Sequence, residues 1–169
     1  MVVTEKRYRV QMEIAGWPIT LAGTRQGIAE VTLGAHSGGQ SPETPPWADE
    51  AKRQLAEYFA SRRRELDLPF HPPRGTPFQE RVWKACREIP YGRVSSYRAL
   101  ACRIGSPGAP RAVGQALGNN PLPLIIPCHR VVRADGRPGG FSAGTHWKEK
   151  LLLLENARPE FWSWNNEIR

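Results

Sequence analysis

A cysteine followed directly by a histidine and an arginine is the feature of the sequence best suited to chemistry. Cys128, His129 and Arg130 lie between two apolar runs, 124–126 and Val131–Val132. A thiol becomes a strong nucleophile when a base or a positive field favours its thiolate, and both influences follow here in the next two positions. The alternative is a buried core thiol, which is the common fate of an unpaired cysteine. The segment therefore predicts either covalent chemistry at Cys128 or a packing role.

The remaining cysteines and histidines favour neither a disulfide framework nor a metal centre. The cysteines are odd in number and widely spaced, at Cys86, Cys102 and Cys128, which argues against paired disulfides. No Cys-x-x-Cys pair or His-x-x-x-His cluster occurs in the sequence. We therefore expect no structural zinc site.

Basic residues are concentrated in the second half of the chain. The net charge is +8, yet residues 1–70 are balanced, with nine basic and nine acidic side chains. Between Ile89 and Lys148 there are eight basic residues and one acidic residue, Asp135. Such a one-sided excess is typical of a protein with a polyanion partner. A basic surface that only keeps the protein in solution is the alternative.

The sequence shows no feature of a membrane or secreted protein. No run of 18 apolar residues is present, and residues 1–10 contain four charged side chains and no apolar signal core. We therefore expect no membrane span and an intracellular location.

The first half predicts a small antiparallel sheet followed by a helix. Residues 8–14 alternate apolar and polar side chains, and 19–22 and 28–33 are further short apolar stretches bounded by turn residues. This is the pattern of strands joined by tight turns. Apolar residues then recur at helical spacing over 46–63, which predicts a helix whose aromatic stripe belongs to the core. The proline-rich stretch 68–74 is expected to resist helix and strand pairing alike and to form a linker.

The second half predicts a helical domain. Thr76, Pro77 and Gln79 form a strong helix start, because threonine can cap, proline fits the first helical position and glutamine completes a capping box. The helix is expected to reach Ile89, with Cys86 on its apolar face as a core thiol. We place this domain at residues 72–157, after an N-terminal domain of residues 1–71 and before a C-terminal tail of residues 158–169.

Two short helices in the basic region predict a helix-turn-helix. One is expected from Ser95 or Ser96 to Ile104 and the other over 110–117, with a glycine-containing turn between them. The second helix is rich in alanine and glycine, and Arg111 is its one long basic side chain. Because reading base edges requires long polar side chains, this surface favours binding through phosphates and groove shape. The alternative is that the alanines only pack against the first helix.

Two further features follow the cysteine segment. Residues 135–140 are rich in turn formers and predict a wing or a lid over a pocket. A last helix is expected to begin at Thr145, which can cap it, and to continue to Leu154. Glu155 then falls in its final turn, where the helix dipole disfavours an acid. Either a partner such as a histidine holds this carboxylate in place, or Glu155 is exposed.

The segment Pro127–Val132 resembles the signature of the O6-alkylguanine-DNA alkyltransferases, also called methylated-DNA–protein-cysteine methyltransferases. The similarity covers about residues 75–157, whereas the N-terminal half is similar only in general layout. It implies an α+β (α/β) fold, in which a small antiparallel sheet with helices in a ribonuclease H-like layout precedes a helical winged helix-turn-helix domain. Further motifs occur in family order and spacing at 78–83, Ile89-Pro90-Tyr91-Gly92, Ser96-Tyr97, Ala112-Val113-Gly114, Asn120-Pro121, Ile125-Ile126, Ser142, Lys148 and Glu155.

The resemblance implies DNA repair by direct, stoichiometric and irreversible transfer of an alkyl group. The group would move from O6-alkylguanine, or from O4-alkylthymine, to Cys128, so the enzyme would be a single-turnover alkyltransferase. It would bind duplex DNA through the minor groove, largely independently of sequence, and rotate the damaged nucleotide into a pocket. No metal or organic cofactor is required. We expect a cytoplasmic, nucleoid-associated monomer.

The resemblance also implies roles for individual residues. Cys128 attacks the alkyl carbon, and His129, oriented by Glu155, takes the thiol proton through a water molecule. Asn120 organises the turn near the site, and Tyr97 contacts the flipped guanine and its phosphate.

Further family positions imply a DNA-contacting set and a pocket. Arg111 matches the finger residue that fills the space vacated in the base stack, and Ser142 matches a hydrogen-bond donor to the O6 side of the base. Phe141 stands where many relatives have tyrosine and Ala143 where some have glycine, departures that can alter tolerance of bulky alkyl groups. The DNA-contacting set is Tyr97, Arg111, Ala112, Gly114 and Gln115. The pocket set is Val131, Phe141, Ser142, Ala143 and Lys148.

Three other functions are compatible with parts of the sequence. A non-catalytic alkyltransferase-like damage binder would keep the scaffold, but the presence of Cys128 argues against it. A helix-turn-helix regulator would need more base-reading side chains than the second helix offers. A cysteine hydrolase using Cys128 and His129 would act many times, so stoichiometry separates it from an alkyltransferase.

Overall fold

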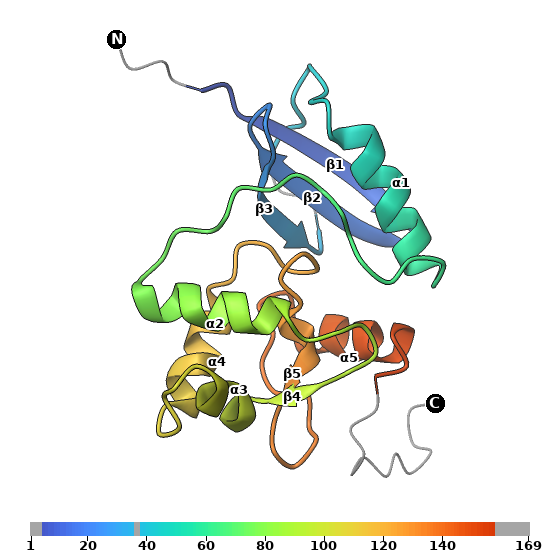
Figure 1. The fold of residues 1–169 in the computed structure, drawn as a ribbon. Helices are drawn as coiled ribbons and strands as arrows, with labels where there is room; N and C mark the ends of the chain where they lie inside the picture. Colours follow the sequence, from blue (N-terminus) through green and yellow to red (C-terminus); the bar gives the residue numbers. More distant parts are fainter. Residues whose placement is uncertain (1–4, 36–37, 158–169) are drawn as a thin grey trace.

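The N-terminal half is a three-stranded antiparallel sheet with one helix beside it (Figure 1). The fold is described from a computed structural model over residues 5–35 and 38–157, so the predicted tail of residues 158–169 lies outside the described residues. Ala15 and Gly16 join the first two strands in a two-residue turn with φ angles of 53° and 78°, as a tight hairpin requires. The elements are β1 (Tyr8–Ile14), β2 (Trp17–Gly23), β3 (Ile28–Leu33) and α1 (Ala48–Phe59).

The predicted linker contains a strand-like contact, so the expectation that residues 68–74 resist strand pairing was wrong. Phe70 forms a parallel bridge with Ile28. The Ile28 amide donates to the Pro69 carbonyl at 2.9 Å, and the His71 amide donates to the Ile28 carbonyl at 2.7 Å. Proline lacks an amide hydrogen but keeps its carbonyl, so Pro69 can accept a bond at the sheet edge.

Up to residue 157, the second half contains four α-helices, which gather in the lower part of Figure 1. The capping box of Thr76 and Gln79 is present at the first of them. Ser96 caps the second, because its hydroxyl accepts from the Ala99 amide at 3.0 Å. Thr145 was expected to cap the last helix, but Gly144 precedes that helix with φ 99° and no side chain caps it. The helices are α2 (Pro77–Arg87), α3 (Tyr97–Arg103), α4 (Pro110–Gly118) and α5 (Thr145–Leu154).

Helices α3 and α4 pack against each other as the helix-turn-helix prediction requires, and α4 also packs on α2. The Trp83 indole donates to the Ala116 carbonyl at 2.8 Å and joins α2 to α4. Val113, Ala116 and Leu117 are buried. One of the alanines of α4 therefore packs inward, while the other side of the helix remains available to a partner.

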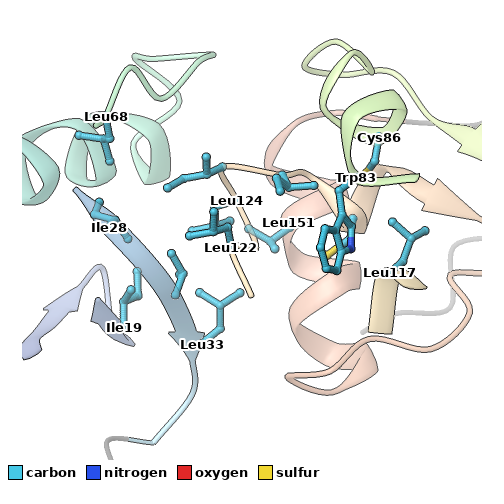
Figure 2. Close-up of a cluster of buried hydrophobic side chains, with 14 of the residues drawn as sticks. Ile19, Ile28, Leu33, Leu68, Trp83, Cys86, Leu117, Leu122, Leu124 and Leu151 are labelled. Carbon is cyan, nitrogen blue, oxygen red and sulfur yellow. The ribbon is translucent and has the colours of Figure 1, made fainter. Parts of the chain in front are cut away.

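One apolar core runs through both halves of the chain. Figure 2 shows Ile19 and Ile28 of the sheet on one side and Trp83 and Leu117 of the helices on the other, with Leu122 and Leu124 between them. A backbone bond from the Val31 amide to the Pro121 carbonyl, at 2.8 Å, fixes this connecting segment to β3. The segment that precedes the Cys-His pair is thus held by the N-terminal sheet.

No helix in the described part of the chain is long and apolar enough to cross a membrane.

Candidate active site

Cys128 begins a single helical turn between the core segment and a short strand. The turn is the 3-10 helix η1 (Cys128–Arg130), and it leads into β5 (Val131–Val132), which pairs in parallel with β4 (Ser95–Ser96). The Cys128 amide donates to the Ile126 carbonyl at 2.8 Å. The Cys128 side chain is 5% exposed and lines a surface groove. The thiol is therefore fixed in place yet open to a ligand on one side.

Asn120 joins the turn and the thiol. Its amide nitrogen donates to the Ile126 carbonyl at 2.9 Å and to the Cys128 Sγ at 3.2 Å, while its Oδ1 accepts from the Leu122 amide at 3.0 Å. Both ends of this buried amide are therefore hydrogen-bonded, its nitrogen as a donor and its oxygen as an acceptor. The predicted role of Asn120 in organising the turn is consistent with this geometry, and Asn120 also offers a hydrogen bond that favours the thiolate.

The surroundings of the Cys128 thiol favour its protonated form. Burial raises its pKa, although the Asn120 hydrogen bond, the Lys148 charge and nearby backbone amides act in the opposite direction. A buried neutral thiol is a poor nucleophile, so a base must remove its proton before it reacts. The cation near the sulfur is Lys148, whereas the sequence had pointed to Arg130.

Arg130 turns away from the sulfur and binds Glu155. Its Nε donates to Glu155 Oε2 at 2.9 Å, its Nη2 to Glu155 Oε1 at 2.9 Å and its Nη1 to the Ile89 carbonyl at 2.7 Å. The expectation that Arg130 supplies a positive field to the thiol was therefore wrong, because the turn of η1 directs consecutive side chains to different sides. Sequence adjacency alone could not reveal this.

His129 is fully buried and paired with Glu155. Its Nε2 lies 2.8 Å from Glu155 Oε1, so the ionised carboxylate requires that Nε2 carry the hydrogen. Burial, which disfavours the imidazolium, lowers the pKa of His129 in spite of the attraction of Glu155. Among the residues that the structure describes, His129 Nδ1 is the one buried side-chain nitrogen or oxygen without a hydrogen-bond partner. A neutral imidazole with its basic nitrogen unused can accept a proton.

Glu155 is a buried carboxylate with five donors. Besides His129 and Arg130, it accepts from the Tyr58 hydroxyl at 2.5 Å and from the Gly92 amide at 3.2 Å. Burial raises its pKa, but the hydrogen bonds from His129 and Arg130 and the charge of Arg130 outweigh burial and hold that pKa at about 2. Of the two alternatives for Glu155, the structure supports a held carboxylate and excludes exposure.

Two contributors to the Glu155 site were not predicted. Tyr58 was assigned to the core by its helical spacing, and it is buried, but its hydroxyl contacts Glu155 across the two halves of the chain. Gly92 adopts φ 75°, and a Cβ at this position would lie 3.1 Å from the Glu155 carbonyl oxygen. A positive φ at this position favours glycine. The Pro90-Tyr91-Gly92 turn is the sequence signal that pointed here.

The groove beside Cys128 has a volume of about 940 Å³ and lies between α3, α4 and the loop after β5. Tyr97 begins α3, and its hydroxyl accepts from Lys148 Nζ at 3.2 Å. Gly139 is required in the loop, because a Cβ there would lie 2.7 Å from the Tyr97 hydroxyl oxygen. Of the predicted residues, the groove is lined by Tyr97, Arg111, Gly114, Gln115, Cys128, Phe141 and Ser142.

The other predicted residues lie behind or beside the groove. Asn120, Val131 and Lys148 are buried, and burial lowers the pKa of the Lys148 ammonium to about 8. Ala112 and Ala143 are half-buried and do not line the groove. Within residues 5–35 and 38–157, no three His, Cys, Asp or Glu side chains are grouped as metal ligands.

Acid is expected to lower the free energy of unfolding in two steps, the first through His129 and the second through Glu155. The pKa of His129 is lower in the folded than in the unfolded protein, so stability begins to fall as the pH drops below about 6.5. The pKa of Glu155 falls from 4.5 unfolded to about 2 folded, so its contribution of about 3 kcal/mol is present above pH 4.5 and disappears toward pH 2. Urea unfolding at a series of pH values measures both losses, and Glu155→Gln should remove the second.

Comparison with known proteins places this geometry in a family. The family model for the 6-O-methylguanine DNA methyltransferase DNA-binding domain matches residues 77–157, and the model for the ribonuclease-like domain of the same proteins matches residues 8–72. A methylated-DNA–protein-cysteine methyltransferase of Methanosarcina acetivorans is 42% identical over 147 residues, which are 83% of this chain and 92% of the relative. The chain belongs to the methylated-DNA–protein-cysteine methyltransferases.

Other members of the methyltransferase family are also similar to this chain in sequence or in structure. The constitutive enzyme of Bacillus subtilis is 48% identical over 119 residues, or 70% of each chain. The crystal structure of the Mycobacterium tuberculosis O6-methylguanine methyltransferase superposes with a TM-score of 0.80 and 38% identity, covering 91% of this chain and 95% of that one. A structure of the M. tuberculosis protein in complex with DNA gives a TM-score of 0.77, with 39% identity over 92% of this chain and 96% of that one. The predicted α+β fold of the methyltransferases is thereby confirmed.

Proposed function

We propose that this methyltransferase repairs duplex DNA by moving an alkyl group from O6 of guanine, and from O4 of thymine, to the Sγ of Cys128, once per protein molecule. The observation that carries the proposal is the position of Cys128. This thiol lines a groove walled by α3 and α4. His129 follows it in the same turn and is paired with the buried Glu155 at the end of α5. A nucleophile, a base and an orienting acid are thus present in one site.

The proposed reaction is an in-line displacement at the alkyl carbon. His129 Nδ1 takes the thiol proton through a water molecule, and the sulfur forms a bond to carbon as the carbon–O6 bond breaks. The bonding electrons leave with guanine, which then takes up a proton. Tyr97 lines the groove, and Lys148 Nζ donates to its hydroxyl at 3.2 Å, so this hydroxyl is a donor available to the leaving guanine. The thioether product has no good leaving group, so Cys128 is not regenerated.

The groove fits a base taken out of the duplex. Enzymes that act on an atom buried in stacked DNA must extrude the nucleotide, which costs a few kcal/mol. The exposed Arg111 at the start of α4 is available to fill the vacated space, and the small residues Gly114 and Ala112 permit close approach to the minor groove. We expect binding to be largely independent of sequence, because such contacts act on phosphates and groove shape. We further propose that the protein acts as a cytoplasmic, nucleoid-associated monomer.

Stoichiometry tests the function. A fixed amount of protein is incubated with excess duplex DNA that contains O6-methylguanine with a labelled methyl group. We expect protein-bound label to reach one methyl group per protein molecule and then stop. Continued turnover would indicate a hydrolase, and binding without transfer would indicate a damage binder.

Arg111→Ala is expected to slow repair of duplex DNA by about 10- to 100-fold, because loss of the stacking side chain raises the cost of base extrusion. Reaction with the free base O6-benzylguanine needs no extrusion and should change by less than about twofold on the same argument. Single-turnover rates with both substrates measure the difference. Arg103→Ala removes an exposed arginine of α3 that does not line the groove, and it controls for lost charge. If Arg111→Ala lowered the rate equally with both substrates, Arg111 would have no role in base extrusion.

A further inference from the structure

Tyr58 is the one hydroxyl of the N-terminal half that the structure records on the Glu155 carboxylate. It lies near the end of α1, is 2% exposed and donates to Glu155 Oε1 at 2.5 Å. The same oxygen accepts from His129 Nε2 at 2.8 Å. The proposed base and this tyrosine therefore share one acceptor atom, although 71 positions separate them in sequence.

Packing fixes the Tyr58 hydroxyl against that oxygen. The ring lies edge-on to Phe59, with centroids 5.4 Å apart at 87°, and edge-on to Tyr91, at 5.9 Å and 90°. Helix α1 in turn packs against β1. The hydroxyl is thus positioned from the N-terminal domain.

Burial and the neighbouring charges determine the protonation state of the Tyr58 hydroxyl. Glu155 and Arg130 face Tyr58, with the Tyr91 hydroxyl nearby, and burial together with the Glu155 charge raises the pKa of Tyr58 well above its usual value. Glu155, Arg130 and Lys148 are the charges that act on His129. Tyr58 is therefore a neutral donor near neutral pH, and its hydroxyl withdraws negative charge from the oxygen that His129 uses.

We propose that Tyr58 is a positioning residue through which the N-terminal domain holds Glu155 and limits the basicity of His129. A carboxylate oxygen that accepts from Tyr58 attracts the imidazolium less than a free one does. His129 then stays neutral near neutral pH and can accept the Cys128 proton. The effect on the rate of repair rests on the proposed alkyl transfer, whereas the effect on His129 does not.

Tyr58→Phe tests this proposal, because it keeps the ring and removes only the hydroxyl. Without the donor, Glu155 interacts more strongly with the imidazolium, so the pKa of His129 should rise by roughly half to one pH unit, since four other donors remain. NMR titration of the imidazole signals measures this rise in folded molecules. The acid limb of the single-turnover pH–rate profile with O6-methylguanine duplex should move to higher pH by the same amount, and the plateau rate at high pH should stay within about twofold.

Tyr91→Phe is the matched control. The Tyr91 hydroxyl lies at the same junction but donates to the Leu154 carbonyl, at 3.2 Å, and not to Glu155. We expect both the His129 titration and the pH–rate profile of this variant to follow the wild-type protein. A thermal melt of each variant separates lost stability from a changed titration.

The outcomes distinguish the proposal from the function on which it rests. An unchanged His129 titration in Tyr58→Phe, or an equal change in Tyr91→Phe, would overturn the role of Tyr58. A shifted titration in a protein whose wild-type form transfers no methyl group would support the coupling of Tyr58 to His129 and refute the proposed alkyl transfer.

Discussion

Cys128→Ala is expected to abolish alkyl transfer completely while duplex binding is retained. The thiol is the proposed acceptor, and the groove holds no second cysteine. The change removes one sulfur atom beside the Asn120 amide, which keeps its bond to the Ile126 carbonyl. The fold of the groove should therefore persist. Transfer of labelled methyl and binding to O6-methylguanine duplex are measured on the same preparation.

The other two cysteines provide the controls for that experiment. Cys86 is buried in α2, where burial raises the pKa of its thiol well above the usual value, and Cys102 is exposed on α3. Cys102→Ala should transfer a full equivalent. Methyl label on Cys86 or Cys102 in the Cys128→Ala protein would show that the acceptor has been assigned to the wrong residue.

Glu155→Ala is expected to reduce both stability and rate. The substitution leaves Arg130, the His129 Nε2 hydrogen and the Tyr58 hydroxyl buried without their acceptor. Removing one partner of a buried ion pair costs about 3–5 kcal/mol, because the remaining charge is uncompensated. Loss of the group that orients a general base should slow transfer by about 10²- to 10³-fold. Urea unfolding and single-turnover rates measure the two effects.

Glu149 offers a matched control in the same helix. It is half-buried in α5 and forms no ion pair recorded in the described part of the chain. Glu149→Ala should change stability by less than about 0.5 kcal/mol and leave the rate unaltered. If Glu155→Ala were as stable and as fast as Glu149→Ala, Glu155 would be neither the structural anchor nor the orienting acid.

The elements of the fold were largely predictable because local signals determine them. The alternation in residues 8–14, the Thr76–Gln79 capping box and the glycine turn before residue 110 each specify a backbone conformation within a few positions. The predictions failed where contact with a residue distant in the sequence determines the local conformation. Phe70 pairs with Ile28 because β3 offers an open edge, and no local pattern in a proline-rich stretch contains that information.

The site was predictable to the extent that its residues occur in one motif. Cys128 and His129 are adjacent, and Glu155 was recognisable as an acid in an unfavourable helical position. Tyr58 was not recognisable, because helical spacing shows only that the side chain faces the core and cannot name an acceptor 97 residues away. Arg130 was misassigned for a related reason, since its direction depends on the turn of η1 and on the Glu155 carboxylate that receives it.

The central claim is that one sulfur atom accepts an alkyl group from DNA and retains it. Incubation with excess O6-methylguanine duplex, followed by intact mass measurement and peptide mapping, tests that claim most directly. We predict a single gain of one methylene per protein molecule, located on Cys128, with no further gain on longer incubation. An unmodified protein after the DNA has been repaired, or a methyl group on any other residue, would contradict the account.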